Sequence, residues 1–170
     1  MAAINNPYLN NAYQNKLDAL TKQYEASAFQ NAYQNQLAKA TQKETNRASI
    51  NNYMGLTNRY GVQAEQRAMN GLNNAGVENR INTNAYRNLQ NNYGNATKTY
   101  LGTVAENNNN LLQAQYQNEA NKLDAMGDYN TNLYNEYLRQ TQEEYQRERD
   151  KVADKQWERD YKLRKKQMSL

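Results

Sequence analysis

Apolar and tyrosine side chains recur along this chain at steps of three and four residues, which is the spacing of one face of an α-helix. The clearest unit is residues 11–17, an Asn-Ala-Tyr-Gln-Asn-Lys-Leu sequence that returns at 31–37 and, more weakly, at 84–89. In both full copies a Tyr and a Leu stand four apart, so on a helix they share one face. The pattern predicts helices with a narrow aromatic and aliphatic stripe. Such a stripe is too thin to bury a core unless another helix packs on it.

The order of these segments predicts an all-α fold of long helices. Residues 1–8 are expected to form an extended arm, because Pro7 disfavours helix in the residue before it. Residues 9–127 are expected to form a helical hairpin, and residues 128–170 a separate helix after a break at Gly127. The Asn- and Gly-rich stretch 70–77, which holds Gly71 and Gly76, predicts the reversal of the hairpin, since both residue types tolerate left-handed backbone conformations.

A seven-residue spacing favours coiled-coil-like packing between these helices. Before the turn it is carried by Ala12, Ala19, Ala26, Tyr33 and Ala40, and beyond the turn by Tyr86, Tyr93 and Tyr100. A step of eleven residues from Tyr100 to Leu111 resembles a stutter, which locally unwinds a coiled coil. Four asparagines, residues 107–110, fall in that gap. They form either a polar layer within a helix or a loop, and we favour the helix.

The predicted packing positions, through which the helices or the copies of the chain would meet, are the large side chains of these stripes. They are Tyr13, Leu17, Tyr33, Leu37, Tyr86, Leu89, Tyr93, Tyr100, Tyr145 and Trp157. Tyrosines can instead stack on bases or sugars, but the helical spacing favours packing. Tyrosine suits a wet helix interface because it combines a large ring with a hydroxyl that can bond to a neighbouring amide.

The composition leaves two states open. Of the 170 residues, 38% are hydrophobic, and there are 15 Tyr but a single Phe and a single Trp. The 30 Asn and 17 Gln make up more than a quarter of the chain. A chain of this composition can stay disordered, as a scaffold or binding module that folds on a partner or on nucleic acid. The single proline and the helical spacing favour helices stabilised by packing, and therefore a homo-oligomer.

Charge is concentrated at the C-terminal end. Residues 128–170 hold ten of the 21 basic and nine of the 17 acidic residues. Mixed charge of this density is typical of a solvated helix face. The net charge of +4 is mild and is not a nucleic-acid signature by itself. Four basic residues at the end suit a helix C-terminus and offer a weak contact for DNA: Lys162, Arg164, Lys165 and Lys166.

The chemistry of an enzyme is missing from the sequence. The chain has no His and no Cys, which removes the common catalytic triads and most transition-metal sites. Residues 128–132 open like a calcium loop, but Leu133 and Arg139 occupy the positions where that loop needs Gly and Glu. We therefore expect no catalysis, no cofactor, no metal and no small-molecule substrate. We also expect no signal peptide and no transmembrane segment, and hence synthesis in the cytoplasm.

Two stretches, residues 65–72 and residues 149–161, carry a resemblance. With the Asn- and Gly-rich helices between them, the chain resembles small helical virion proteins of tailed bacteriophages. In general character it is also similar to the internal, DNA-ejection proteins of short-tailed phages. The resemblance implies a structural protein of the virion, made in the host cytoplasm and located in or at the portal or tail. It also implies other virion proteins as partners, and it assigns no functional residue.

Overall fold

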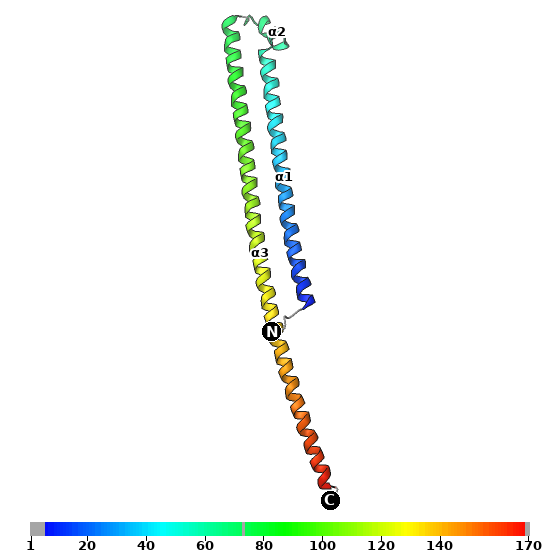
Figure 1. The fold of residues 1–170 in the computed structure, drawn as a ribbon. Coiled ribbons are helices and arrows are strands. Elements are labelled where there is room, and N and C mark those ends of the chain that lie inside the picture. The colour runs from blue at the N-terminus through cyan, green and yellow to red at the C-terminus, as the bar shows by residue number, and fades with distance from the viewer. Residues whose placement is uncertain (1–5, 73, 169–170) are drawn as a thin grey trace. The chain divides into compact units, whose positions relative to one another are not determined.

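The computed structural model describes residues 6–72 and 74–168, and these residues form three helices (Figure 1). The helices are α1 (Pro7–Thr57), α2 (Val62–Met69) and α3 (Ala75–Met168). No strand occurs in the described ranges. The all-α prediction is therefore confirmed. The four asparagines 107–110 lie inside α3, so the helical interpretation of that stretch is also confirmed.

The N-terminus of α1 is set by Asn6 and Pro7. The Asn6 side-chain oxygen accepts hydrogen bonds from the backbone N–H groups of Tyr8 (3.1 Å) and Leu9 (3.3 Å), which caps the helix. Pro7 follows at the first helical position, where a missing N–H costs nothing. Pro7 and Tyr8 were expected in an extended arm, but they begin the helix. Residues 1–5 of that arm lie outside the described residues.

The chain reverses after α2, within the predicted stretch. The backbone N–H of Leu72 bonds to the carbonyl of Arg67 (2.9 Å), and that of Gly71 to the carbonyl of Ala68 (3.1 Å). These two bonds form a Schellman motif, and Gly71 provides the left-handed residue that it needs, with φ of 70°. Asn74 then caps α3 through a side-chain bond from the N–H of Val77 (2.9 Å). Gly76 lies in the first turn of α3 and takes no part in the reversal.

The described chain divides into two compact units. Unit 2, Gln23–Gln117, is a helical hairpin in which the second part of α1 lies beside the first part of α3 (Figure 1). Its pairing is antiparallel, because Asn35 meets Asn107 while Gln42, further along α1, meets Thr97. Arg67 from α2 donates a hydrogen bond to the Leu56 carbonyl (3.3 Å), which ties α2 to the end of α1. Unit 1 consists of Met1–Lys22 and Asn118–Leu170.

The covered positions of unit 2 recur every eleven residues, which differs from the seven-residue spacing that was expected. On α1 these covered residues include Tyr24, Asn35, Asn46 and Thr57, and on α3 they include Ala85, Ala96 and Asn107. Eleven residues make three turns at 3.67 residues per turn, close to the 3.6 of a straight helix. The step from Tyr100 to Leu111 is therefore the rule in this hairpin and not a local stutter. The residues spaced by seven, from Ala12 to Ala40, drift around α1 and are largely exposed.

Unit 1 is held by contacts between the first turns of α1 and the stretch of α3 near Tyr129. Tyr13 stacks on Tyr129 with ring centroids 4.7 Å apart. The Tyr129 hydroxyl donates a hydrogen bond to the Asn10 side chain, and Lys16 Nζ lies 3.1 Å from Asp128 Oδ2. This ion pair is more than half exposed, so its contribution to stability is small.

The break expected at Gly127 is not observed. α3 runs without interruption through this residue, where an added Cβ would meet nothing within 4 Å. A glycine within a helix lowers its stability by about 1 kcal/mol relative to alanine. The hydrogen bonds of a long helix can offset this loss. The charged segment 128–170 is thus the continuation of α3 as far as Met168, and no separate helix forms.

Exchanging the two glycines of the turn region for alanine should have opposite effects. Gly71→Ala places a side chain on a left-handed residue and should lower the free energy of unfolding by about 1–2 kcal/mol. The matched change Gly76→Ala lies in an ordinary helical turn with room for the methyl group, and should raise it by about 0.4–1 kcal/mol. Urea unfolding at a fixed protein concentration, followed by circular dichroism, measures both. Midpoints that shift in the same direction would contradict this account of the turn.

Candidate assembly surfaces

Four side-chain amides meet across the hairpin of unit 2. Asn107 Nδ2 donates to Asn35 Oδ1 (2.8 Å), Asn31 Nδ2 donates to the backbone carbonyl of Asn107 (2.5 Å), and Asn35 Nδ2 donates to Asn31 Oδ1 (3.2 Å). Asn35 also reaches Asn108 at the exposed edge (3.5 Å). Asn107 is only 8% exposed. Each amide finds its hydrogen-bond partner only when the two helices are aligned at this position. The cluster therefore fixes the register of α1 against α3.

Apolar burial within the chain is small. Among the residues that the structure describes, the buried apolar ones are Ala85 and Ala125, at 3% and 2% exposure, and no large side chain is fully buried. The accessible surface is 14093 Å². A compact monomer of 19.8 kDa is expected to expose about 8,600 Å². The contacts of α1 with α3 therefore leave most of the large apolar side chains in solvent.

One group of exposed apolar residues forms a stripe on α1, within unit 2. The α1 stripe consists of Ala26, Phe29, Tyr33, Leu37 and Ala40. Phe29, Tyr33 and Leu37 are 76%, 60% and 56% exposed. Tyr33 is two residues from both Asn31 and Asn35, and so lies about 160° around the helix from each. The centre of the α1 stripe at Tyr33 therefore faces away from α3, while Leu37 at its edge also borders the groove between the two helices.

A second group forms a row along α3. The α3 row consists of Leu101, Leu112, Leu123, Tyr134 and Tyr145, each eleven residues after the one before it. The first two belong to unit 2 and the others to unit 1. All five are exposed, from 46% at Leu112 to 65% at Tyr145. Leu112 follows the buried Asn107 by five residues, about 140° around the helix. Within unit 2 the row is thus a second face of α3, with the same spacing as the covered one, and its members in unit 1 keep that spacing in the sequence.

The predicted packing residues fall into two sets. Tyr13, Leu17, Leu89, Tyr93 and Tyr100 are half-buried. The other five are exposed: Tyr33, Leu37, Tyr86, Tyr145 and Trp157. The stripe expected on α3 is therefore split, since Tyr86 stands outside the covered face that holds Leu89, Tyr93 and Tyr100. For the exposed set, packing against another copy stays a prediction.

Sequence reasoning missed Asn31, Asn35 and Ser49 as members of the covered face, although the polar layer favoured at residues 107–110 includes the buried Asn107. Asparagine and serine are usually solvent-exposed, and the packing face was therefore assigned from the large tyrosines next to them. The available signal was the eleven-residue spacing of small and amide residues, such as Ala85, Ala96 and Asn107.

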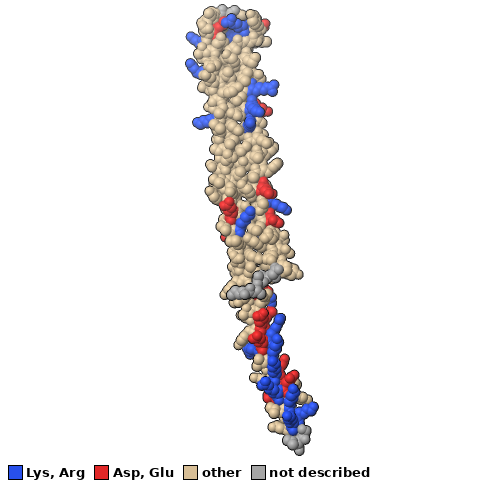
Figure 2. Space-filling view, in the orientation of Figure 1, with Lys and Arg blue, Asp and Glu red and all other residues tan. Residues whose placement is uncertain are grey.

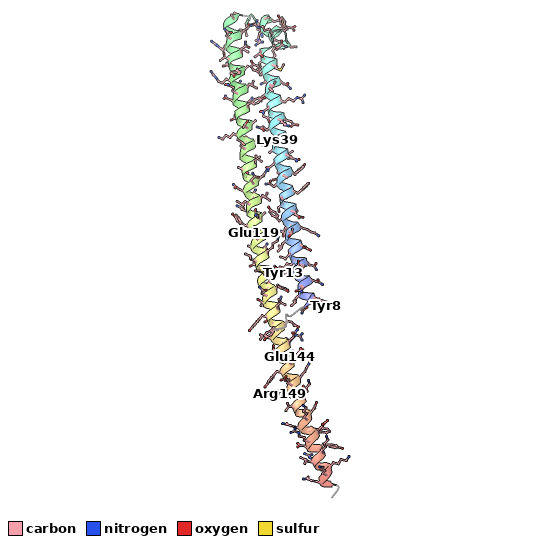
Figure 3. The ribbon with its side chains drawn as sticks, in the orientation of Figure 1. Tyr8, Tyr13, Lys39, Glu119, Glu144 and Arg149 are labelled. Carbon is pink, nitrogen blue, oxygen red and sulfur yellow. The ribbon has the colours of Figure 1, made fainter. Side chains whose placement is uncertain are left out.

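The C-terminal part of α3 carries a dense mixture of charges (Figure 2). Glu144 and Arg149, labelled in Figure 3, are exposed, as is every described side chain from Tyr137 to Gln167. Arg139 bridges Glu136, at 2.7 Å, and Glu143 one turn further along. The hydrogen bond from Arg139 is the main cause that lowers the pKa of Glu136, with a smaller contribution from Gln140. Lys162, Arg164, Lys165 and Lys166 are all exposed in this stretch, and their contact with DNA stays a prediction.

A groove of about 530 Å³ runs between α1 and α3 within unit 2. Its walls include Thr41 and Thr45 from α1 and Asn95, Thr99 and Thr103 from α3, and none of its lining residues is charged. In the described ranges no group of three or more His, Cys, Asp or Glu residues is placed to hold a metal ion.

None of the described helices combines the length and the apolar character needed to cross a membrane. Comparisons with protein-family models, with curated proteins and with solved structures found no match for this chain. The surfaces described above are therefore interpreted from their own geometry.

The asparagine cluster predicts a specific loss of stability. Asn35→Ala removes the acceptor of the buried Asn107 amide and should lower the free energy of unfolding by about 1–3 kcal/mol. The control Asn109→Ala changes an exposed amide on the same helix as Asn107 and should stay within about 0.5 kcal/mol. The double variant Asn35→Ala/Asn107→Ala should cost less than the sum of its two single changes. Additive losses, measured by urea unfolding, would show that the two amides act independently.

Proposed function

We propose that this chain is a non-enzymatic structural protein of a tailed-bacteriophage particle and that it works as a homo-oligomer of its helices. The observation that carries the proposal is the α3 row, five large apolar side chains exposed at a regular spacing of eleven residues. Exposed Tyr116 and Leu138 each stand four residues after a member of the row and extend its apolar surface. Soluble monomers rarely expose large contiguous apolar patches unless these bind something. The resemblance of residues 65–72 and 149–161 to phage virion proteins supports a place in or at the portal or tail.

The shared spacing favours other helices of the same kind as the partners of the α3 row. A row spaced by eleven residues drifts only slowly around a helix, so a second helix can follow it with a slight right-handed supercoil. Residues 7–57 and 75–168 of another copy supply such helices, with the same spacing. Self-assembly would therefore cover the large side chains that α1 and α3 leave exposed. Other virion proteins, and DNA during ejection, are further partners under this proposal.

Dilution of the purified protein tests the assembly. We expect an oligomer at micromolar concentration by sedimentation velocity, and a weaker one for Leu112→Gln, whose association midpoint should move at least about tenfold higher. This shift follows from the roughly 1.5–3 kcal/mol that burying a leucine contributes. Gln113→Ala, a change at the next residue and about 100° around the helix, is the matched control and should leave the midpoint in place.

Two results would overturn the proposal. A compact helical monomer at every concentration would remove the homo-oligomer. A chain that is disordered alone and becomes helical only with DNA or a protein partner would favour the alternative of a scaffold that folds on binding. The virion assignment has its own test, mass spectrometry of purified phage particles. If the protein is present in infected cells but absent from particles, that assignment is wrong.

A further inference from the structure

We propose that two copies of this chain pair through the α1 stripe, with the two α1 helices antiparallel and Tyr33 of each copy at the two-fold axis. The inference rests on the proposed homo-oligomer. It goes further by naming the surface and its occupant, which is the same surface of a second copy. The stripe is open for this contact, because Tyr33 at its centre faces away from α3 and its three large side chains are at least 56% exposed.

The stripe is symmetric about Tyr33. Phe29 and Leu37 stand four residues on either side, and Ala26 and Ala40 stand seven residues on either side. A two-fold axis at Tyr33 therefore sets Phe29 against Leu37 of the second copy, and Ala26 against its Ala40. The small alanines at both ends let the two backbones approach, while the three large side chains fill the centre. No charged residue belongs to the stripe.

Charge at the ends of the stripe selects the antiparallel arrangement. Lys22 and Glu44 stand eleven residues before and after Tyr33, three helical turns away on the same face. Neither residue takes part in an ion pair with another described residue. Antiparallel pairing sets Lys22 of each copy against Glu44 of the other, so both ends carry opposite charges. Parallel pairing in register would set Lys22 against Lys22 and Glu44 against Glu44.

The short length of the α1 stripe limits the stability of this pair. Ala26 and Ala40 are about 21 Å apart along the helix, and one helix face of that length buries less than the roughly 800 Å² per partner of a standard stable interface. The pair is therefore one contact of a larger assembly and fixes the direction in which neighbouring copies run. A weak, specific contact of this kind is best captured by cross-linking.

Single cysteines report this geometry directly, because the chain has none of its own. Tyr33→Cys should form disulfide-linked dimers under mild oxidation. The control Gln34→Cys lies about 100° around the helix and beside the groove of unit 2, and should form at least tenfold fewer. For direction, Lys22→Cys and Glu44→Cys should each give no disulfide-linked dimer alone, and should cross-link when the two variants are mixed. Equal cross-linking at Gln34, or dimers of Lys22→Cys alone, would overturn the antiparallel pair.

A charge exchange supplies a second readout that needs no cysteine. Lys22→Glu sets two acidic residues together at each end and should raise the association midpoint several-fold at low salt, whereas Lys22→Glu/Glu44→Lys should restore it. If the wild-type chain is monomeric throughout, the proposed function fails as well. If it is oligomeric while Tyr33→Cys does not cross-link and the charge exchange has no effect, the α1 stripe is not the interface and only this inference is overturned.

Discussion

The pairing of α1 with α3 through small and amide side chains is the constraint on which the rest of this structure depends. A leucine or tyrosine seam would bind more strongly, but it would also allow the helices to slide by one turn at little cost. The buried amide of Asn107 finds its acceptor on Asn35 in one register only. Loss of that partner is costly for an amide that is only 8% exposed. Polar residues here therefore fix the alignment of the helices, where apolar residues would only strengthen their contact.

The small and amide residues between α1 and α3 leave the large apolar side chains on the outer surface. Since Ala, Ser and Asn occupy much of the covered face of unit 2, side chains such as Phe29, Tyr33 and Leu112 stand on other faces. The polar seam of Asn31, Asn35 and Asn107 thus holds one chain in register, while the apolar α1 stripe and α3 row remain for other chains. The eleven-residue spacing serves both purposes, because covered and exposed rows then stay parallel along nearly straight helices.

The helical class was predictable from the sequence, and so was the reversal near Gly71. Both follow from local effects: periodic apolar spacing, few helix-breaking residues, and a glycine that adopts a left-handed turn. The identity of the covered face was not predictable in the same way. Large tyrosines show where apolar surface can be buried. They do not show whether α1, α3 or another copy of the chain covers that surface. Tyr86 and Tyr93 look equivalent at seven-residue spacing, yet they separate by about 20° per heptad on a straight helix, and only Tyr93 is half-buried.

The distribution of charge explains where the α3 row ends. Up to Tyr145 the row carries one charge on its flank, Glu119, four residues before Leu123. Glu136, Arg139 and Glu143 pair with one another elsewhere on the helix. Beyond Tyr145 the next residue at this spacing is Gln156, and Arg149 occupies the flank that Leu138 fills one repeat earlier. Charged residues then occur at every angle around the helix. Burying any such face would remove charged side chains from water. The free-energy cost of that desolvation exceeds the stabilisation that burial of the remaining apolar side chains would give. This stretch can therefore stay a solvated single helix, supported by its own pairs at three- and four-residue spacing.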